Sequence, residues 1–162
     1  MTFRLPKMSD AEIGRLIREQ ALCRIAFRGS KHPYIAPFQY VFIDGVLYFH
    51  FTRSGTGFKM FKRDRRVCVE VEMYKTDLSE YRFVAMRGSL ERVKNPDERA
   101  KAIRRMAEDG RQKLSENFLA AHGFSRQDGW AALSPEKPLE IVKLTDVTET
   151  VGLKSPEMPM SS

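Results

Sequence analysis

Apolar and polar residues alternate along much of this chain with a period of two, the pattern of β-strands that have one buried face. The clearest case is the segment Val67–Met73, in which three valines and a methionine alternate with a cysteine and two glutamates. Similar segments rich in aromatic and β-branched residues predict five further strands. The six predicted strands are Leu22–Phe27, Tyr34–Ile43, Val46–Phe51, Val67–Met73, Tyr81–Val93 and Leu139–Leu153.

Two of the connections carry their own signals. Asp44-Gly45 separates two predicted strands and predicts a two-residue hairpin, because both residue types tolerate a positive φ. Gly88 lies inside the fifth predicted strand, where a glycine indicates a bulge or a close approach of another segment.

Helices are predicted from capping signals. Ser9 and Glu12 have the spacing of a capping box and predict a helix from Asp10 to about Gln20. After a turn rich in glycine and hydroxyl residues, Phe58–Arg65 is expected to form a short basic helix.

Two more helices are predicted before the last strand. Asn95 is the expected N-cap of a helix that begins at Pro96, has Glu98 at the capping-box position, and ends near Glu108 because Gly110 stops it. Apolar residues at helical spacing predict another helix over Leu114–His122.

This order of elements predicts a mainly β (α+β) fold. We expect a small antiparallel barrel of six strands, with an N-terminal helix, a short helix after the third strand and two helices before the last strand. A chain of 162 residues suits one domain. Residues 1–154 are expected to form it, and residues 155–162, with two prolines and no periodicity, to be a flexible tail.

Composition and charge narrow the class of protein. Hydrophobic residues make up 42% and charged residues 30%, no apolar run could cross a bilayer, and no secretory signal is visible, so a cytoplasmic protein without membrane contact is expected. The net charge of +7 favours anionic partners. Much of the excess is concentrated in Phe51–Arg66. Such a compact patch suits a phosphate-bearing small molecule better than nucleic acid, which needs a wider basic face or a reading helix.

Cysteines and histidines give no sign of a metal site. Cys23 and Cys68 lack the spacing of metal ligands, and the three histidines do not form a ligand pattern. His32 and His122 are expected to be solvated. His50, at the end of a predicted strand, is either packed in the structure or in contact with a ligand.

The segment His50–Lys59 carries the strongest functional signal, because it leaves a strand, turns through glycines and enters a helix. Backbone N–H groups and the positive end of a helix dipole can bind a phosphate there, with added charge from Arg53 and Lys59. The segment matches neither a Walker A loop nor a dinucleotide fingerprint. An ordinary connection between strand and helix is the alternative.

Four motifs in this order resemble the FMN-binding split-barrel family, in particular its pyridoxamine 5'-phosphate oxidase-related branch, which includes nitroimidazole-resistance reductases. The resemblance covers about residues 9–153. The motifs are Pro33–Tyr40, Asp44–His50, Arg66–Val71 and Tyr81–Gly88.

The resemblance implies a homodimer of split barrels with FMN in clefts between the subunits, and a small-molecule substrate that the sequence does not identify. No nucleic-acid partner is expected, because the positive charge is compact and no reading motif is present. His50 is the candidate catalytic residue, because related nitroimidazole reductases have a histidine close to the flavin. The resemblance implies cofactor contacts at Pro37, Phe38, Gln39, Tyr40, His50, Phe51, Thr52, Arg53, Gly55, Thr56, Gly57, Lys59, Arg82 and Phe83.

The chain departs from the family at the phosphate site. Many relatives have a basic pair where this sequence has Thr56 and Gly57. Either Arg53 and Lys59 replace the missing charge, or the flavin is held weakly.

Two kinds of function follow from the resemblance. The first is an FMN-dependent oxidoreductase, in which the flavin carries the electrons and no catalytic set of side chains is required. The second is a non-catalytic flavin- or haem-binding or redox-sensing protein that uses the same cleft. The deazaflavin F420 is a further alternative to FMN.

Overall fold

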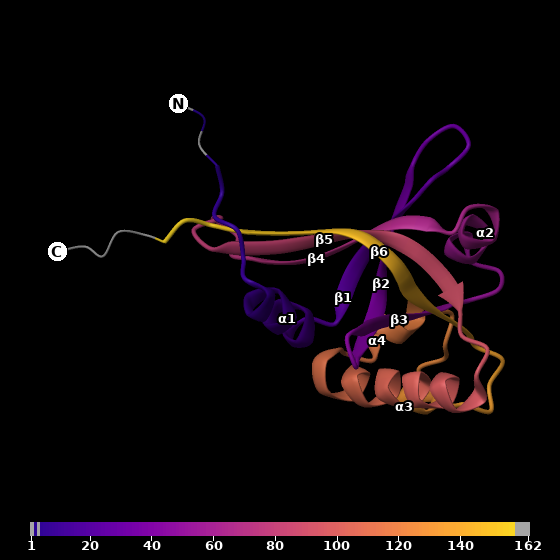
Figure 1. The fold of residues 1–162 in the computed structure, drawn as a ribbon. Coiled ribbons are helices and arrows are strands. Elements are labelled where there is room, and N and C mark those ends of the chain that lie inside the picture. The colour runs from indigo at the N-terminus through magenta and orange to yellow at the C-terminus, as the bar shows by residue number, and fades with distance from the viewer. Residues whose placement is uncertain (1, 3, 158–162) are drawn as a thin grey trace.

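The computed structural model describes residues 2 and 4–157, and its six strands form a closed antiparallel barrel in the order β1-β2-β3-β6-β5-β4 (Figure 1). This confirms the predicted fold class. The strands are β1 (Leu22–Phe27), β2 (Tyr34–Ile43), β3 (Val46–Phe51), β4 (Arg66–Tyr74), β5 (Tyr81–Arg92) and β6 (Glu140–Lys154). The helices are α1 (Asp10–Glu19), α2 (Thr56–Arg63), α3 (Pro96–Lys113) and α4 (Asn117–Ala120), with a 3-10 turn over Gly129–Ala132.

The two predicted glycine features of the barrel are confirmed. Asp44 and Gly45 have φ of 48° and 80° and form the two-residue turn between β2 and β3. Gly88 lies where the register of β5 against β6 shifts between Arg87 and Ser89. A Cβ at position 88 would lie 2.7 Å from the backbone oxygen of Thr145, so any side chain there would push β6 away.

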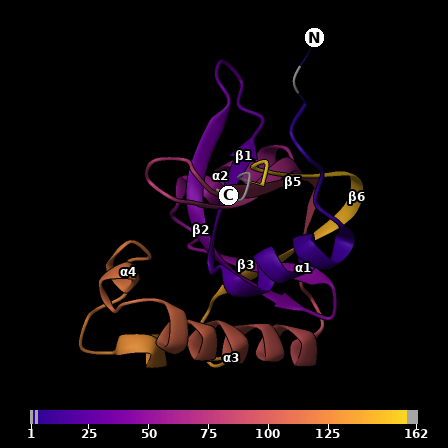
Figure 2. The ribbon, with the colours of Figure 1, turned by 90° about the vertical axis from the view of Figure 1, so that its left-hand side faces the viewer.

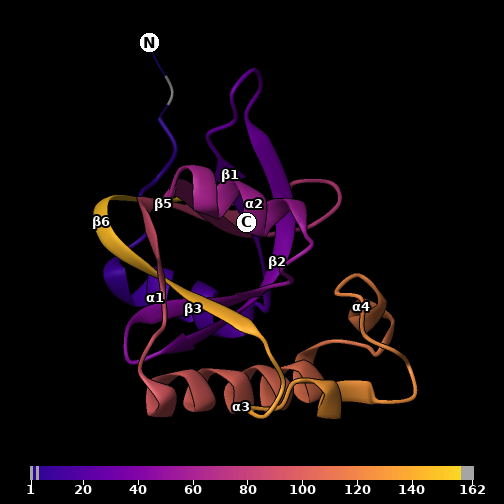
Figure 3. The same ribbon diagram turned by 90° about the vertical axis from the view of Figure 1, so that its right-hand side faces the viewer.

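Apolar residues form two cores on the two faces of the barrel wall. The interior holds one cluster, in which Ile25, Phe49 and Val69 are fully buried. The second cluster joins the outer face of β2, β3 and β6 to α3, which runs along that side of the barrel (Figure 2, Figure 3), and it contains Ile103 and Met106. Burying a side chain of this size stabilises the fold by about 1.5–3 kcal/mol.

The first two helices begin close to the predicted positions. In α1 the Ser9 side chain accepts from the Glu12 N–H and the Glu12 side chain accepts from the Ser9 N–H, so the capping box is confirmed. α2 begins at Thr56, two residues before the prediction, because Gly55 takes the N-cap position.

α3 corrects two predictions. It continues past Gly110 to Lys113. Gly110 has a different role, because a Cβ at this position would lie 2.3 Å from the ring of Trp130. The glycine makes room for the indole and does not end the helix. Asn95 caps α3 as predicted, but Glu98 does not complete a capping box. Its carboxylate instead accepts from the Tyr48 hydroxyl at 3.0 Å and from Lys143 at 2.8 Å.

The helix predicted over Leu114–His122 is also shorter in the structure. Leu114 is the C-cap of α3, and only Asn117–Ala120 forms α4. Gly123, with φ of 73°, follows it. At the other end of the chain, Ser155 still bonds to the backbone of Tyr81, and the flexible tail stays a prediction because residues 158–162 lie outside the described residues.

Candidate functional site

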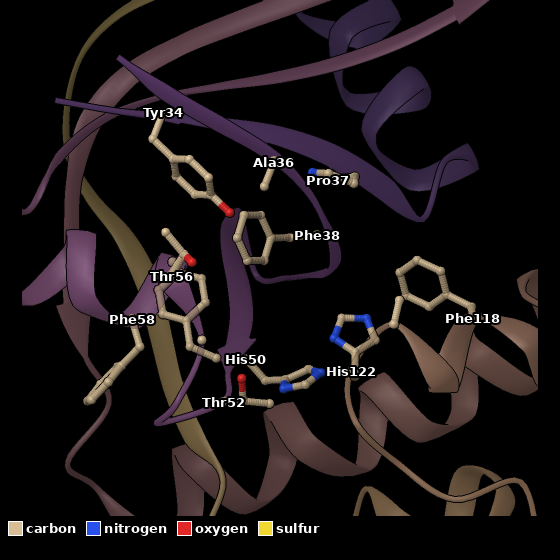
Figure 4. A pocket seen from close by; sticks show the side chains of 14 residues that line it. Tyr34, Ala36, Pro37, Phe38, His50, Thr52, Thr56, Phe58, Phe118 and His122 are labelled. Carbon is tan, nitrogen blue, oxygen red and sulfur yellow. The ribbon is translucent and has the colours of Figure 1, made fainter. Parts of the chain in front are cut away.

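A pocket of about 300 Å³ opens between β2, the end of β3, the start of α2, and α4 (Figure 4). We call it the β2–α2 pocket. Its size lies at the lower end of the range for ligand pockets. Its lining residues are Tyr34, Ala36, Pro37, Phe38, His50, Phe51, Thr52, Gly55, Thr56, Gly57, Phe58, Phe118, Ala121 and His122.

Aromatic side chains form one wall of the pocket. The alternation along β2 places Tyr34, Ala36 and Phe38 on one face, and Figure 4 shows Tyr34 and Phe38 turned toward Thr56. Phe38 contacts Phe51 edge to face, with ring centroids 5.1 Å apart and planes at 70°. This packing holds the rings in place, so the wall is a pre-formed apolar surface suited to a planar ligand.

The first turn of α2 forms the opposite wall. The first N–H groups of a helix have no partner inside it, and no side chain caps them in α2. They therefore present hydrogen-bond donors and the positive end of the helix dipole, equivalent to about half a charge. A Cβ at Gly57 would lie 2.8 Å from Cζ of Phe38, so only a glycine lets this turn approach the aromatic wall so closely.

Two histidines close the far end of the pocket, where the His50 ring, from β3, lies 4.5 Å from the His122 ring, from the segment after α4. His50 is 2% exposed, and neither of its ring nitrogens has a hydrogen-bond partner among the described residues. Burial, followed by the neighbouring His122, lowers the pKa of His50 to about 3.

His122 corrects the expectation that it is solvated. It is half-buried, and the Nε2 atom of its ring has no partner within the described part of the chain. Burial lowers its pKa to about 4. Both rings are therefore neutral at pH 7, and each can donate or accept one hydrogen bond toward a ligand. His32, in contrast, is exposed as predicted.

The structure brings eight of the fourteen predicted site residues to this pocket, six of them from β2, the end of β3 and the following turn, and two from the first turn of α2. They are Pro37, Phe38, His50, Phe51, Thr52, Gly55, Thr56 and Gly57. Gln39 and Tyr40 lie outside it, buried where β2 enters the core. Gln39 donates to the Met106 carbonyl at 2.9 Å and Tyr40 to the Ile17 carbonyl at 2.5 Å, so both are occupied with structural hydrogen bonds.

The remaining predicted residues lie elsewhere. Lys59 is exposed and does not line the pocket. Arg53 faces a neighbouring hollow, where its Nε donates to Glu140 at 2.8 Å. Arg82 and Phe83 lie at the start of β5, paired with Lys154 and Leu153 at the far end of the barrel. Within one chain they do not reach the β2–α2 pocket.

Six lining residues are not among the cofactor positions that the resemblance implies: Tyr34, Ala36, Phe58, Phe118, Ala121 and His122. The alternation with Phe38 could have identified Tyr34 and Ala36. No local pattern connects α4 with the end of β3, because that contact depends on how α3 packs against the barrel. Across the described residues, no group of three or more His, Cys, Asp or Glu side chains could hold a metal ion, and no helix is long and apolar enough to cross a membrane.

Comparison with known proteins gives a family and several structural neighbours. Residues 9–136 match the family model described as pyridoxamine 5'-phosphate oxidase. Comparison with the curated proteins found no match.

Three solved structures with the same fold have little sequence identity to this chain. A FAD-binding protein from Mesorhizobium loti is 16% identical, with a TM-score of 0.68 over 95% of this chain and 98% of its own. A candidate 5-nitroimidazole antibiotic resistance protein from Bacteroides thetaiotaomicron is 16% identical, with a TM-score of 0.65 over 95% and 92%. A FAD and heme binding protein from Mycobacterium smegmatis is 15% identical, with a TM-score of 0.64 over 95% and 75%.

Proposed function

The chain belongs to the pyridoxamine 5'-phosphate oxidase family, and from this premise we propose that it is a flavin-binding protein that takes up FMN in the β2–α2 pocket. The flavin phosphate would bind at the N-terminus of α2, beside Thr52 and Thr56. The ring system would lie against the aromatic wall, with the two neutral histidines at the far end. FAD-binding proteins among the structural neighbours support a flavin in general.

One observation carries the proposal: an uncapped helix N-terminus lies next to a pre-formed aromatic wall, and Gly57 allows this close approach. Uncapped N–H groups bind phosphate without a basic side chain. In this proposal the N-terminus of α2 takes the place of the basic pair that many relatives have where this chain has Thr56 and Gly57. Arg53 and Lys59 are not needed as phosphate ligands.

The activity we propose is an oxidoreductase reaction on a small molecule. When bound, the flavin supplies the electron-transfer chemistry. The chain's own residues orient it and exclude water: Phe38 and Phe51 cover the ring, and His50 and His122 offer one hydrogen-bond donor or acceptor each. The proposed reaction requires no activated side-chain nucleophile.

A non-catalytic haem-binding protein is the second candidate, because an unpartnered ring nitrogen on His50 or His122 is a suitable axial ligand for iron. A structural neighbour that binds both FAD and heme gives the same alternative. The absorption spectrum separates the two, since haem gives a Soret band and flavin gives two broad bands. F420 would differ from FMN in the identity of the compound released on heating.

We further propose a homodimer with the cofactor at the subunit interface. The strand register places Pro37, Arg24, Glu70, Ala85 and Val151 in one row across the outer face of β2, β1, β4, β5 and β6. This row begins at the edge of the β2–α2 pocket and holds exposed apolar side chains such as Val151, at 37%.

A second copy covering this outer face would bury those apolar side chains. Phe83 is paired with Glu72 across β4 and β5, on the same outer face as Glu70 and Ala85. In such a dimer it could approach the pocket of the other subunit.

Substitution of Thr56, the exposed first residue of α2, tests the phosphate site. In Thr56→Glu the new carboxylate would stabilise the helix through its dipole, yet it would repel a phosphate. We expect FMN to bind at least about tenfold more weakly, which corresponds to about 1.4 kcal/mol. Fluorescence titration measures the affinities for FMN and for riboflavin. Riboflavin, which has the same ring and no phosphate, should bind as it does to the wild-type protein.

Thr56→Gln is the matched control, with the same size and no charge, and it should retain most FMN affinity. Equal weakening of FMN and riboflavin by Thr56→Glu would place the phosphate elsewhere. An unchanged FMN affinity would have the same meaning.

A further inference from the structure

A second hollow lies directly beside the β2–α2 pocket. It has a volume of about 430 Å³ and shares Phe51, Thr52 and His122 with that pocket. We call it the Arg53 hollow. His122 therefore stands in the wall between two cavities, and its Nε2 atom is free of partners among the described residues. Its ring lines both cavities and can contact a ligand in either.

Two cations line the Arg53 hollow. The Arg53 side chain is 71% exposed and uses its Nε for Glu140, whose second oxygen bonds to Arg92 at 3.2 Å. The terminal nitrogens of Arg53 keep the planar fork that suits a carboxylate. Lys137 is exposed and forms no salt bridge with any described residue, so its charge is available.

One acid, Asp128, also lines the hollow. Its carboxylate accepts from the hydroxyl of Ser125 at 3.2 Å and so is partly occupied. Glu140 balances one of the neighbouring arginines. The remaining excess of positive charge in the hollow is small. It suits a monoanion better than a doubly charged phosphate ester.

The rest of the lining is mostly apolar. Phe124 and Leu139 are partly buried and belong to the cluster that packs on α3, so their positions are fixed by the fold. The His50 ring lies 5.8 Å from the Phe124 ring, which connects the hollow to the histidine pair. A ligand in the hollow thus meets cations at one end and carbon at the other.

We propose that the Arg53 hollow binds a small carboxylic acid with an aromatic or aliphatic body. The carboxylate would interact with Arg53 and Lys137, and the body would lie on Phe124 and Leu139 next to His122. Its role as the substrate site rests on the proposed flavin function, since it places the acid one side chain away from the flavin pocket. The binding itself does not depend on flavin.

Benzoate and its neutral analogue benzamide are the probes. Both are titrated into the purified isotope-labelled protein, and the chemical shifts of the His122 and Phe124 rings are followed by NMR. We expect both rings to shift with benzoate, and benzoate to bind at least about tenfold more tightly than benzamide, because charge-assisted hydrogen bonds are lost in the amide.

Lys137→Gln should weaken the binding of benzoate several-fold and leave the affinity for benzamide unchanged. Lys75→Gln is the matched control: Lys75 is 61% exposed, pairs with Glu80 at the β4–β5 turn, and does not line the hollow. It should leave both affinities unchanged. Equal affinity for the two probes, an unchanged benzoate affinity in Lys137→Gln, or shifts confined to other residues would each overturn the proposal.

Flavin uptake is measured on the same samples. Benzoate binding by a protein that takes up no flavin would support the hollow and remove only its role as a substrate site. A protein that binds flavin but shifts neither ring with benzoate would overturn the hollow and leave the flavin site standing.

Discussion

Burial moves the pKa values of the two neutral histidines far from those of histidine in water. His50 and His122 have pKa values lowered to about 3 and about 4, in both cases mainly by burial. Histidine in an unfolded chain has a pKa of about 6.5. As the pH falls below that value the unfolded chain takes up protons that the folded protein does not, so stability is lost with falling pH. The loss continues until the pH reaches the folded values.

We therefore expect the free energy of unfolding to fall by about 2 kcal/mol for each of these histidines between pH 7 and pH 5. Urea denaturation at the two pH values measures the fall. His122→Gln should remove about half of this loss, because one of the two groups no longer titrates. The exposed His32 offers the control, and His32→Gln should behave as the wild-type protein does. An acid-induced loss that His122→Gln does not reduce would contradict the burial of His122.

Among the elements, α3 shows where local sequence signals end and packing takes over. Strand bounds in the first half of the barrel follow the alternation of residues, and the capping box of Ser9 and Glu12 fixes the start of α1, because these signals involve neighbours along the chain. Gly110 has the local signature of a helix stop, yet its role is set by Trp130, 20 residues later in the chain.

The residues of the candidate site show the same difference between local sequence signals and long-range packing. The turn from Thr52 to Gly57 was predicted from sequence because its glycines, hydroxyls and helix start are adjacent. His122 is expected from the sequence to be solvated, and the packing that brings it to His50 has no local signal. For Arg53 the sequence predicts a contact with the phosphate, and its ion pair with Glu140, on β6, depends on strand packing that local sequence does not show.

A pair of glycine substitutions tests this account of α3. Alanine is favoured over glycine inside a helix by about 1 kcal/mol. Gly14→Ala in α1 should approach that gain, because its Cβ would meet only the flexible end of Arg18. Gly110→Ala should instead destabilise the protein by about 1–3 kcal/mol, since its Cβ would overlap the Trp130 ring. Thermal unfolding of both variants gives the comparison, and a Gly110→Ala protein as stable as Gly14→Ala would show that the indole does not pack there.

At the scale of the whole molecule, the barrel has one outer face covered by α3 and another left open. The open face of β1, β4 and β5 carries the ion pair between Arg24 and Glu70 and continues to the edge of the β2–α2 pocket. A second copy of the chain on this face would close the pocket and exclude water from it. Flavin binding and dimer formation are therefore expected to accompany one another.

One measurement tests the central claim directly: size-exclusion chromatography of the freshly purified protein, with light scattering for mass and visible absorption for cofactor, followed by heating and identification of the released compound. We predict a dimer with flavin bands, about one flavin per chain after saturation with FMN, and release of FMN. A colourless protein that takes up neither FMN nor FAD would contradict the proposed site at the N-terminus of α2.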